Sequence, residues 1–146
     1  MTERVALLDV NVLVALLLDT HVHHRVAHAA LAKMDSGWAT CPTTESAAFR
    51  LLLNPRVAGR SITCVEVTAV LAGVRADPRW HFLAESASLV DSTLDTSVLV
   101  GHQQVTDFHL VDVAARHGAT LATFDAGIAQ GLAPPDRRHV TTLPQR

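Results

Sequence analysis

The chain has 146 residues, 49% of them hydrophobic, and a formal net charge of −2. This length fits one domain, residues 1–146, with enough apolar residues for a full core, and it leaves no room for a second catalytic domain. The near-neutral charge gives no general attraction to phosphate backbones, so nucleic-acid binding would need local patches or bound cations.

The N-terminal apolar stretch predicts a buried strand followed by a helix. Residues 4–8 form an apolar run that ends at Asp9, as in a strand that is buried on both faces of a parallel sheet. Asp9 and Asn11 interrupt the stretch, which argues against a transmembrane helix. Because the N-terminus also lacks the pattern of a secretory signal, we expect a cytoplasmic protein without a membrane segment.

Strands and helices alternate along the rest of the chain. Helical periodicity predicts helices over residues 12–17, 21–34, 42–53, 62–74, 88–102 and 107–117. Short apolar segments predict further strands over 37–41, 80–83 at a sheet edge, 120–124 and 140–143. This alternation predicts an α/β fold with a parallel sheet that helices cover on both faces.

Four acidic residues are expected at one edge of this sheet. Asp9 and Asp125 follow strands, Glu45 lies in the first turn of a helix, and Asp107 opens another. Ligands bind beyond the carboxyl ends of parallel strands, so these acids would share one pocket. Their repulsion, about 3–4 kcal/mol per pair at an effective dielectric of about 20, requires either protonation or a divalent cation. Hard oxygen ligands favour Mg²⁺ or Mn²⁺, although each acid could equally be a helix cap or a solvated residue.

Cysteines and histidines give weaker signals. Cys41 and Cys64 are too few for a disulfide framework, and we expect both to be buried. His24 and His28 have the i,i+4 spacing of a zinc pair, but no third ligand has a suggestive spacing, so we expect structural histidines.

Four segments, in this order, resemble PIN-domain ribonucleases, and most closely the VapC toxins of bacterial type II toxin–antitoxin systems. They are LDVNVL at 8–13, TE at 44–45 with FR at 49–50, TDFHL at 106–110 and LATFD at 121–125. The resemblance covers residues 7 to about 129. It implies a three-layer α/β/α PIN-like fold with a five-stranded parallel sheet, and a divalent cation, Mg²⁺ or Mn²⁺.

The resemblance also implies roles for individual residues. Asp9, Glu45, Asp107 and Asp125 fall on the family's four acidic positions, with Asn11 and Thr123 as polar neighbours that orient ligands or water. Thr106 is either such a neighbour or a helix cap. Asp112 lies about 140° around its helix from Asp107, so we expect it to point away from the pocket.

The implied reaction is hydrolysis of single-stranded or looped RNA, with 5′-phosphate and 3′-hydroxyl products. Arg50, Arg56 and Arg60 flank the helix of Glu45 and are expected to contact RNA, or else simply to solubilise the surface. The implied partner is a VapB-like antitoxin whose arginine enters the carboxylate cluster and displaces the metal. A homodimer through the helix stripe of Val65, Ala69, Leu71 and Ala72 and a toxin–antitoxin hetero-oligomer are also implied.

Three alternative functions require a different set of residues or a different activity. A phosphoacceptor receiver domain needs paired acids after its first strand and a lysine after a late strand, but here Asp9 stands alone and Lys33 comes early. A haloacid-dehalogenase-type phosphatase needs a DxD motif, which is Asp9-Val10-Asn11 in this chain. A PIN domain that binds RNA without cutting it remains the third alternative.

Overall fold

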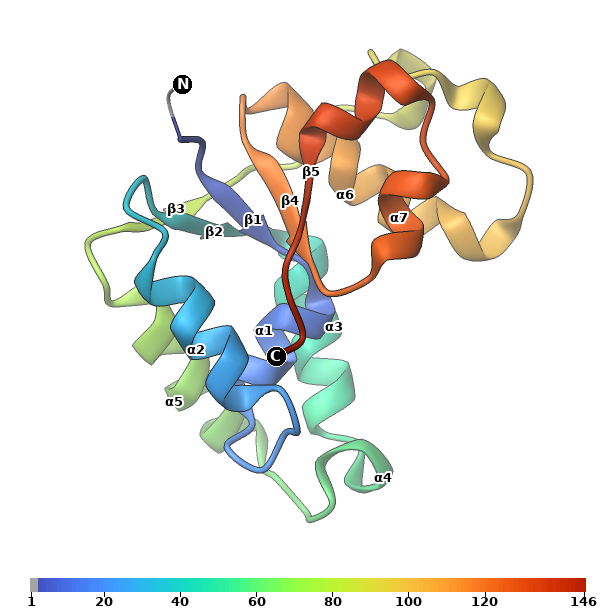
Figure 1. Cartoon of the computed structure of the whole chain (residues 1–146). Coiled ribbons are helices and arrows are strands. Elements are labelled where there is room, and N and C mark those ends of the chain that lie inside the picture. Colours follow the sequence, from blue (N-terminus) through green and yellow to red (C-terminus); the bar gives the residue numbers. More distant parts are fainter. Residues whose placement is uncertain (1–2) are drawn as a thin grey trace.

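Five short parallel strands form one sheet in the order β3-β2-β1-β4-β5 (Figure 1). The structure is a computed structural model that describes residues 3–146. The strands are β1 (Ala6–Leu8), β2 (Trp38–Thr40), β3 (Trp80–Phe82), β4 (Thr120–Thr123) and β5 (Val140–Thr142). β3 lies at one edge of the sheet, as predicted from its sequence.

The helices are α1 (Val10–Leu17), α2 (His24–Ala32), α3 (Pro42–Leu52), α4 (Pro55–Ala58), α5 (Cys64–Arg75), α6 (Val105–Arg116) and α7 (Ala126–Gln130). Four short 3₁₀ turns join them: η1 (Leu89–Asp91), η2 (Thr96–Val98), η3 (His102–Gln104) and η4 (Pro134–His139). Among residues 3–146, no helix has the length and apolar content that crossing a bilayer requires.

Alternate side chains of the strands enter two separate cores. On one face, Ala6 and Leu8 of β1 pack with apolar residues of α1, α2, α3 and α5. On the other face, Leu7 and Leu121 pack with α6, α7 and the segment between β3 and α6. Since both faces are covered, the predicted three-layer α/β/α fold is confirmed.

The side of β1 on which successive strands are added reverses between β3 and β4, which makes the β1–β4 pair a topological switch point. The chain runs from β1 through β2 to β3 on one side, then crosses to β4 and β5 on the other. β1 and β4 are paired in register, with Leu8 beside Ala122, and the backbone N–H of Asp9 donates to the Ala122 carbonyl at 2.9 Å. Such a switch point leaves an open crevice beyond the strand ends, and this is where α/β proteins bind ligands.

The helix predicted over residues 88–102 is wrong. This segment contains η1, η2 and the start of η3, separated by loops. Ser88 accepts a hydrogen bond from the N–H of Val90, and Asp95 accepts two from Ser97. Side chains that bond to nearby backbone in this way compete with helix formation, and the β-branched residues between them add little helix propensity.

Three smaller predictions also need correction. The second helix begins at His24 rather than residue 21, and α6 begins at Val105, so Thr106 is not its N-cap. Cys41 is buried as expected, but Cys64 is exposed at the first position of α5.

Candidate active site

Asp9 and Asp125 lie side by side at the switch point because they follow neighbouring strands. Asp9 is 4% exposed and is the N-cap of α1. Its Oδ1 accepts from the backbone N–H of Val10 at 2.8 Å, and its Oδ2 accepts from the hydroxyl of Thr123 at 2.7 Å. Asp125 caps α7 by accepting from the N–H of Gly127 at 2.8 Å. Both carboxylates are therefore fixed by the backbone that surrounds them.

Thr123 and Asn11 connect these two aspartates. Besides donating to Asp9, the Thr123 hydroxyl accepts from the backbone N–H of Asp125 at 3.0 Å and from Asn11 Nδ2 at 3.2 Å. The amide oxygen of Asn11 in turn accepts from the N–H of Phe124 at 3.3 Å. Both polar residues therefore lie beside the aspartates, where the sequence motif suggested that they orient ligands.

Asp107 joins the two aspartates electrostatically from the first turn of α6. Burial, followed by the charges of Asp9 and Asp125, raises the pKa of Asp107 to about 6. Burial also raises the pKa of Asp9, against the hydrogen bonds from Thr123 and Val10, and the charge of Asp125 raises it further. Three like charges that destabilise one another mark a pocket that attracts a cation or protons.

The donor set of this pocket suits a hard divalent cation. All three ligands would be carboxylate oxygens, and within residues 3–146 no hydrogen bond to the carboxylate of Asp107 is formed. In the same residues, however, no three Asp, Glu, His or Cys side chains stand close enough together to hold one ion jointly. The charges and ligand type therefore fit a metal, while shared coordination requires the aspartates to move closer.

Glu45 lies at the same edge of the sheet but makes different contacts. Its carboxylate accepts from the hydroxyl of Thr40 at 2.5 Å and from Arg75 at 3.2 Å. The guanidinium of Arg75 lies over the ring of Trp80, 4.4 Å from its centroid, and Trp80 Nε1 donates to Thr40. Glu45 is therefore paired with an arginine, whereas Asp9 and Asp107 are each influenced by the negative charge of other aspartates.

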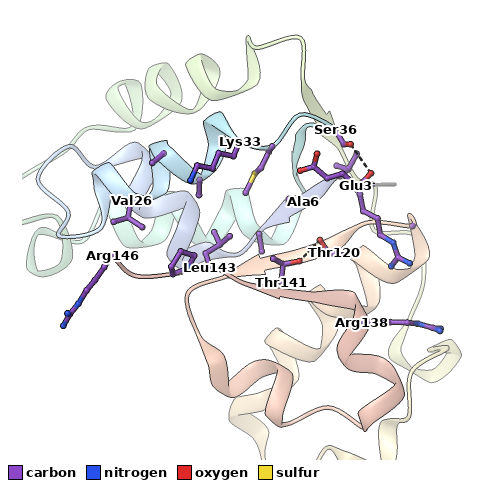
Figure 2. Close-up of a pocket in the computed structure, with 18 of the residues that line it drawn as sticks. Glu3, Ala6, Val26, Lys33, Ser36, Thr120, Arg138, Thr141, Leu143 and Arg146 are labelled. Carbon is purple, nitrogen blue, oxygen red and sulfur yellow. Dashed lines mark hydrogen bonds between the residues drawn. The ribbon is translucent and has the colours of Figure 1, made fainter. Parts of the chain in front are cut away.

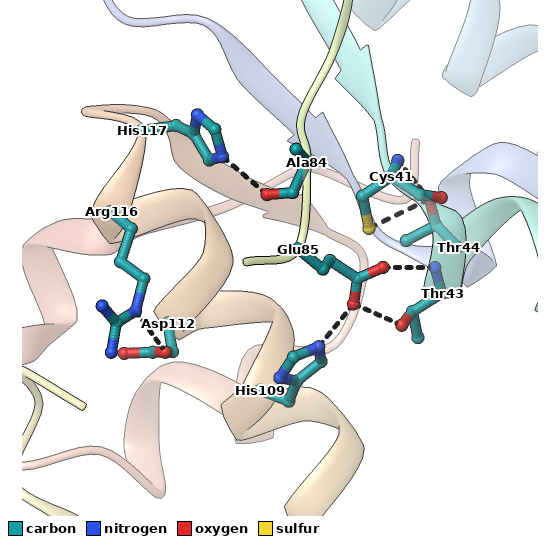
Figure 3. Close-up of polar contacts among 9 residues, drawn as sticks. All are labelled: Cys41, Thr43, Thr44, Ala84, Glu85, His109, Asp112, Arg116 and His117. Atoms are coloured by element: carbon teal, nitrogen blue, oxygen red, sulfur yellow. Dashed lines mark hydrogen bonds and ion pairs between the residues drawn. The ribbon is translucent and has the colours of Figure 1, made fainter. Parts of the chain in front are cut away.

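A polar cluster centred on Glu85, which lies in no sequence motif, ties α3 to α6 (Figure 3). Glu85 accepts from the backbone N–H of Thr43 at 2.8 Å, from the Thr43 hydroxyl at 2.5 Å and from the ring of His109. Burial alone would raise the pKa of Glu85, but these hydrogen bonds hold it below its usual range. The cluster fixes the helix that carries Glu45 against the helix that carries Asp107.

The remaining predicted residues lie farther from this pocket or make no specific contact. Thr106 is exposed, and its hydroxyl forms no hydrogen bond within residues 3–146. Asp112 points elsewhere, as expected, and its carboxylate binds Ser92 and Arg116. Arg50 on α3, Arg56 on α4 and Arg60 after α4 are all exposed.

Sequence reasoning missed Glu85, and it assigned no role to Arg75 or His109. His109 lies two residues after Asp107 in the TDFHL segment, and this position is the sequence feature that could have identified it. Glu85 and Arg75 lie in no motif. Their contacts depend on tertiary structure.

The surface has a small hollow at two of the aspartates and a larger groove elsewhere. A small hollow of about 220 Å³ is lined by Asp107 and Asp125. A groove of about 1410 Å³ opens between α2 and the chain end after β5, and Figure 2 shows Lys33 and Val26 on one side and Leu143 on the other. None of the four predicted acids lines this groove, so its size does not make it the reaction site.

Comparison with known proteins gives consistent matches. Residues 6–131 match the model of the PIN domain family. In Mycobacterium tuberculosis (strain ATCC 25618 / H37Rv), ribonuclease VapC38 is 47% identical over 124 residues, which are 84% of this chain and 86% of the relative. Ribonuclease VapC29 is 37% identical over 84% of this chain and 87% of its own length. Ribonuclease VapC44 is 36% identical over 94% of this chain and 99% of its own length.

Proposed function

Because the chain belongs to the VapC ribonucleases of the PIN domain family, we propose that it is an endoribonuclease and the toxin of a type II toxin–antitoxin system. The observation that carries the proposal is the group of Asp9, Asp107 and Asp125 at the switch point of the sheet, where burial and the charge of Asp125 raise the pKa of Asp9, and burial and the charges of Asp9 and Asp125 raise the pKa of Asp107. An uncompensated acidic group of this kind is costly for a purely structural role. It suits a site that works with a bound dication.

We propose that the dication is Mg²⁺, with Mn²⁺ as a substitute, held by Asp9, Asp107 and Asp125. When bound, it would supply positive charge that polarises the phosphoryl oxygens and acidifies water. Asp9 is preorganised by Thr123 and Val10. Asp107, with no protein partner in the described chain, is free to turn toward the other two.

We propose that Glu45 accepts the proton of the attacking water. Its carboxylate is not shared with the aspartates, because Thr40 and Arg75 hold it. The Glu85 cluster bridges α3 and α6 and so maintains the separation between Glu45 and Asp107. Asn11 and Thr123 act by holding Asp9 and the backbone of Asp125 in place.

The proposed substrate is single-stranded or looped RNA in the cytoplasm. The exposed Arg50, Arg56 and Arg60 lie on and beyond the helix of Glu45, and guanidinium groups bind phosphates and stack on unpaired bases. A VapB-like antitoxin is the proposed inhibitor, because an arginine side chain could neutralise the acidic pocket in place of the cation.

A homodimer through α5 is also part of the proposal. Val65 on this helix is 80% exposed, and Ala69 and Ala72 are exposed beside it, whereas Leu71 of the predicted stripe is buried in the core. The toxin–antitoxin hetero-oligomer would be built from such dimers.

Cleavage of total RNA tests the function. The purified chain is incubated with RNA in Mg²⁺, in Mn²⁺ and in EDTA, alongside the Asp9→Asn variant. Cutting that requires the metal and is lost in Asp9→Asn supports the proposal. Undiminished cutting in EDTA contradicts it, and metal-dependent binding without any cutting would indicate an RNA-binding PIN domain instead.

A further inference from the structure

A second hollow shares Asp125 with the small hollow that Asp107 lines. It is open, has a volume of about 490 Å³, and is lined by Asn11, His21, His23, Phe124, Gln145 and residues 125–127. Pockets of this size hold small organic groups. When a phosphodiester bond lies at the aspartates, the base of the adjacent nucleotide is within reach of this hollow.

Aromatic rings form one wall of the hollow. The ring of His23 lies 5.3 Å from that of Phe124, and the ring of His21 lies 5.7 Å from that of His23, measured between centroids. His21 and His23 are half-buried, so parts of their rings face solvent. Flat rings in such a position are the platforms on which proteins stack unpaired bases.

Hydrogen-bonding groups of opposite kinds complete the lining. His21 Nδ1 accepts from the backbone N–H of His23 at 3.0 Å, which leaves the proton of a neutral ring on Nε2 as a donor. Burial, with the charges of His23 and His24, lowers the pKa of His21 and favours this neutral form. Gln145 donates through Nε2 to the carbonyl of Phe124 at 3.0 Å, and its amide oxygen has no partner in residues 3–146.

The charge of the hollow argues for a base rather than a phosphate. Among its lining residues in the described chain, Asp125 is the only acidic residue, and there is no lysine or arginine. An anion would meet this carboxylate without a compensating arginine or lysine. An uncharged base instead finds ring faces, one donor and one acceptor, which match the donors and acceptors on base edges.

We propose that this hollow is a nucleobase subsite, in which His21, His23 and Gln145 hold an unpaired base next to the phosphodiester bond at the aspartates. The subsite rests on the proposed RNA cleavage. It adds the means by which this chain selects the position of the cut.

Titration with uncharged ribonucleosides tests the subsite without any cleavage. The imidazole signals of the full chain are followed by NMR while adenosine, guanosine, cytidine or uridine is added, and His21→Ala and His23→Ala assign the two signals. Stacking predicts upfield shifts at His21 and His23 with at least one nucleoside. His81, exposed on the far edge strand β3, serves as the reference. Unmoved signals at His21 and His23 with all four nucleosides, or equal shifts at His81, would overturn the proposal.

Sequencing of cleavage ends tests the subsite during the reaction. A pool of single-stranded RNA with randomised sequence is cut by the wild-type chain and by His21→Ala, Gln145→Ala and the control His81→Ala. We expect wild type and the control to share a base preference at one position beside the cut. His21→Ala and Gln145→Ala should each lose about tenfold in discrimination at that position alone, in line with the loss of hydrogen bonding to a base edge.

The two experiments separate the subsite from the function on which it rests. Preferences that stay the same in His21→Ala and Gln145→Ala would contradict the subsite while leaving RNA cleavage intact. If wild type cuts no RNA in Mg²⁺ or Mn²⁺, the proposed function fails, and the nucleoside titration alone decides whether the hollow binds bases.

Discussion

The hydroxyl of Thr123 donates a hydrogen bond to Oδ2 of Asp9 at 2.7 Å, across 114 positions of sequence. Neither residue is more than 4% exposed. The same hydroxyl accepts from the backbone N–H of Asp125 and from Asn11. One oxygen atom therefore holds the carboxylate of Asp9 and the backbone of Asp125 in place, and its removal should disturb stability and catalysis together.

Thr123→Val tests this relationship. The substitution keeps the shape of the side chain but leaves a buried carboxylate oxygen without a partner, and this should lower the free energy of unfolding by about 1–3 kcal/mol. RNA cleavage should fall by at least about tenfold, because Asp9 loses its fixed orientation. Urea denaturation and initial cleavage rates give the two values. Thr123→Ser retains the hydroxyl and should stay near wild type in both, and equal losses in Ser and Val would argue against the hydrogen bond.

Asp107→Asn should stabilise the metal-free protein near neutral pH. The pKa of Asp107 is raised to about 6, so the folded state holds this proton more tightly than the unfolded state does. The resulting stability is full below about pH 4 and is lost as pH rises through about 6. Because Asp107 is half-buried, solvent screens part of this repulsion, and the variant should gain about 1 kcal/mol at about pH 7.5.

Urea denaturation in EDTA at about pH 5 and about pH 7.5 measures this effect. The difference between Asp107→Asn and wild type should widen with pH. A constant difference would show that the charge of Asp107 is not opposed by its neighbours. The variant should nevertheless be inactive, because the carboxylate that destabilises the metal-free protein is also a proposed ligand of the cation.

Removing Glu85 should eliminate the polar bridge between Thr43 on α3 and His109 on α6 and so lower stability. Glu85→Ala eliminates the two hydrogen bonds with Thr43 and the contact with His109, and we expect a loss of about 2–3 kcal/mol in the free energy of unfolding. The matched control is Asp91→Ala, because Asp91 is exposed on η1. Thermal and urea denaturation of both variants provide the comparison. A loss no larger than that of Asp91→Ala would contradict the role of Glu85.

Arg75 and Arg79 provide a matched pair for testing Glu45. Arg75 binds Glu45 at 3.2 Å and lies over Trp80, while Arg79 binds Asp77 at 3.1 Å and lies over Trp38. Both ion pairs are partly exposed, so substitution of either arginine by methionine should cost at most about 1 kcal/mol of stability. Only Arg75→Met should lower kcat for RNA cleavage, by about tenfold, because only Arg75 orients Glu45. Equal rates in the two variants would remove Arg75 from the site.

Asp9, Asp125 and the positions of the strands along the chain could be predicted from sequence because their signals are local. A continuous apolar run marks a buried strand, and an acid directly after it must lie at the carboxyl edge of the sheet. The contacts of Glu45 could not be predicted in this way. Its position on α3 is local information, but its partner Arg75 lies 30 residues further along the chain.

The segment between β3 and α6 could not be predicted because local periodicity misled. Val90, Leu94 and Val98 have the i, i+4, i+8 spacing of a helical face, and Leu94 is indeed buried in the core. The backbone nevertheless follows the hydrogen bonds of Ser88 and Asp95 into separate 3₁₀ turns. In this segment, the spacing of apolar residues indicated that Leu94 is buried but did not indicate the backbone conformation.

Mn²⁺ binding followed by electron paramagnetic resonance tests most directly whether the three aspartates form one cation site. Titration of the wild-type chain should show a saturable site whose bound Mn²⁺ loses the free-ion signal. Asp9→Asn, Asp107→Asn and Asp125→Asn should each weaken that site by at least about tenfold, because each carboxylate is a hard oxygen ligand. Undiminished Mn²⁺ affinity in all three variants would contradict the account.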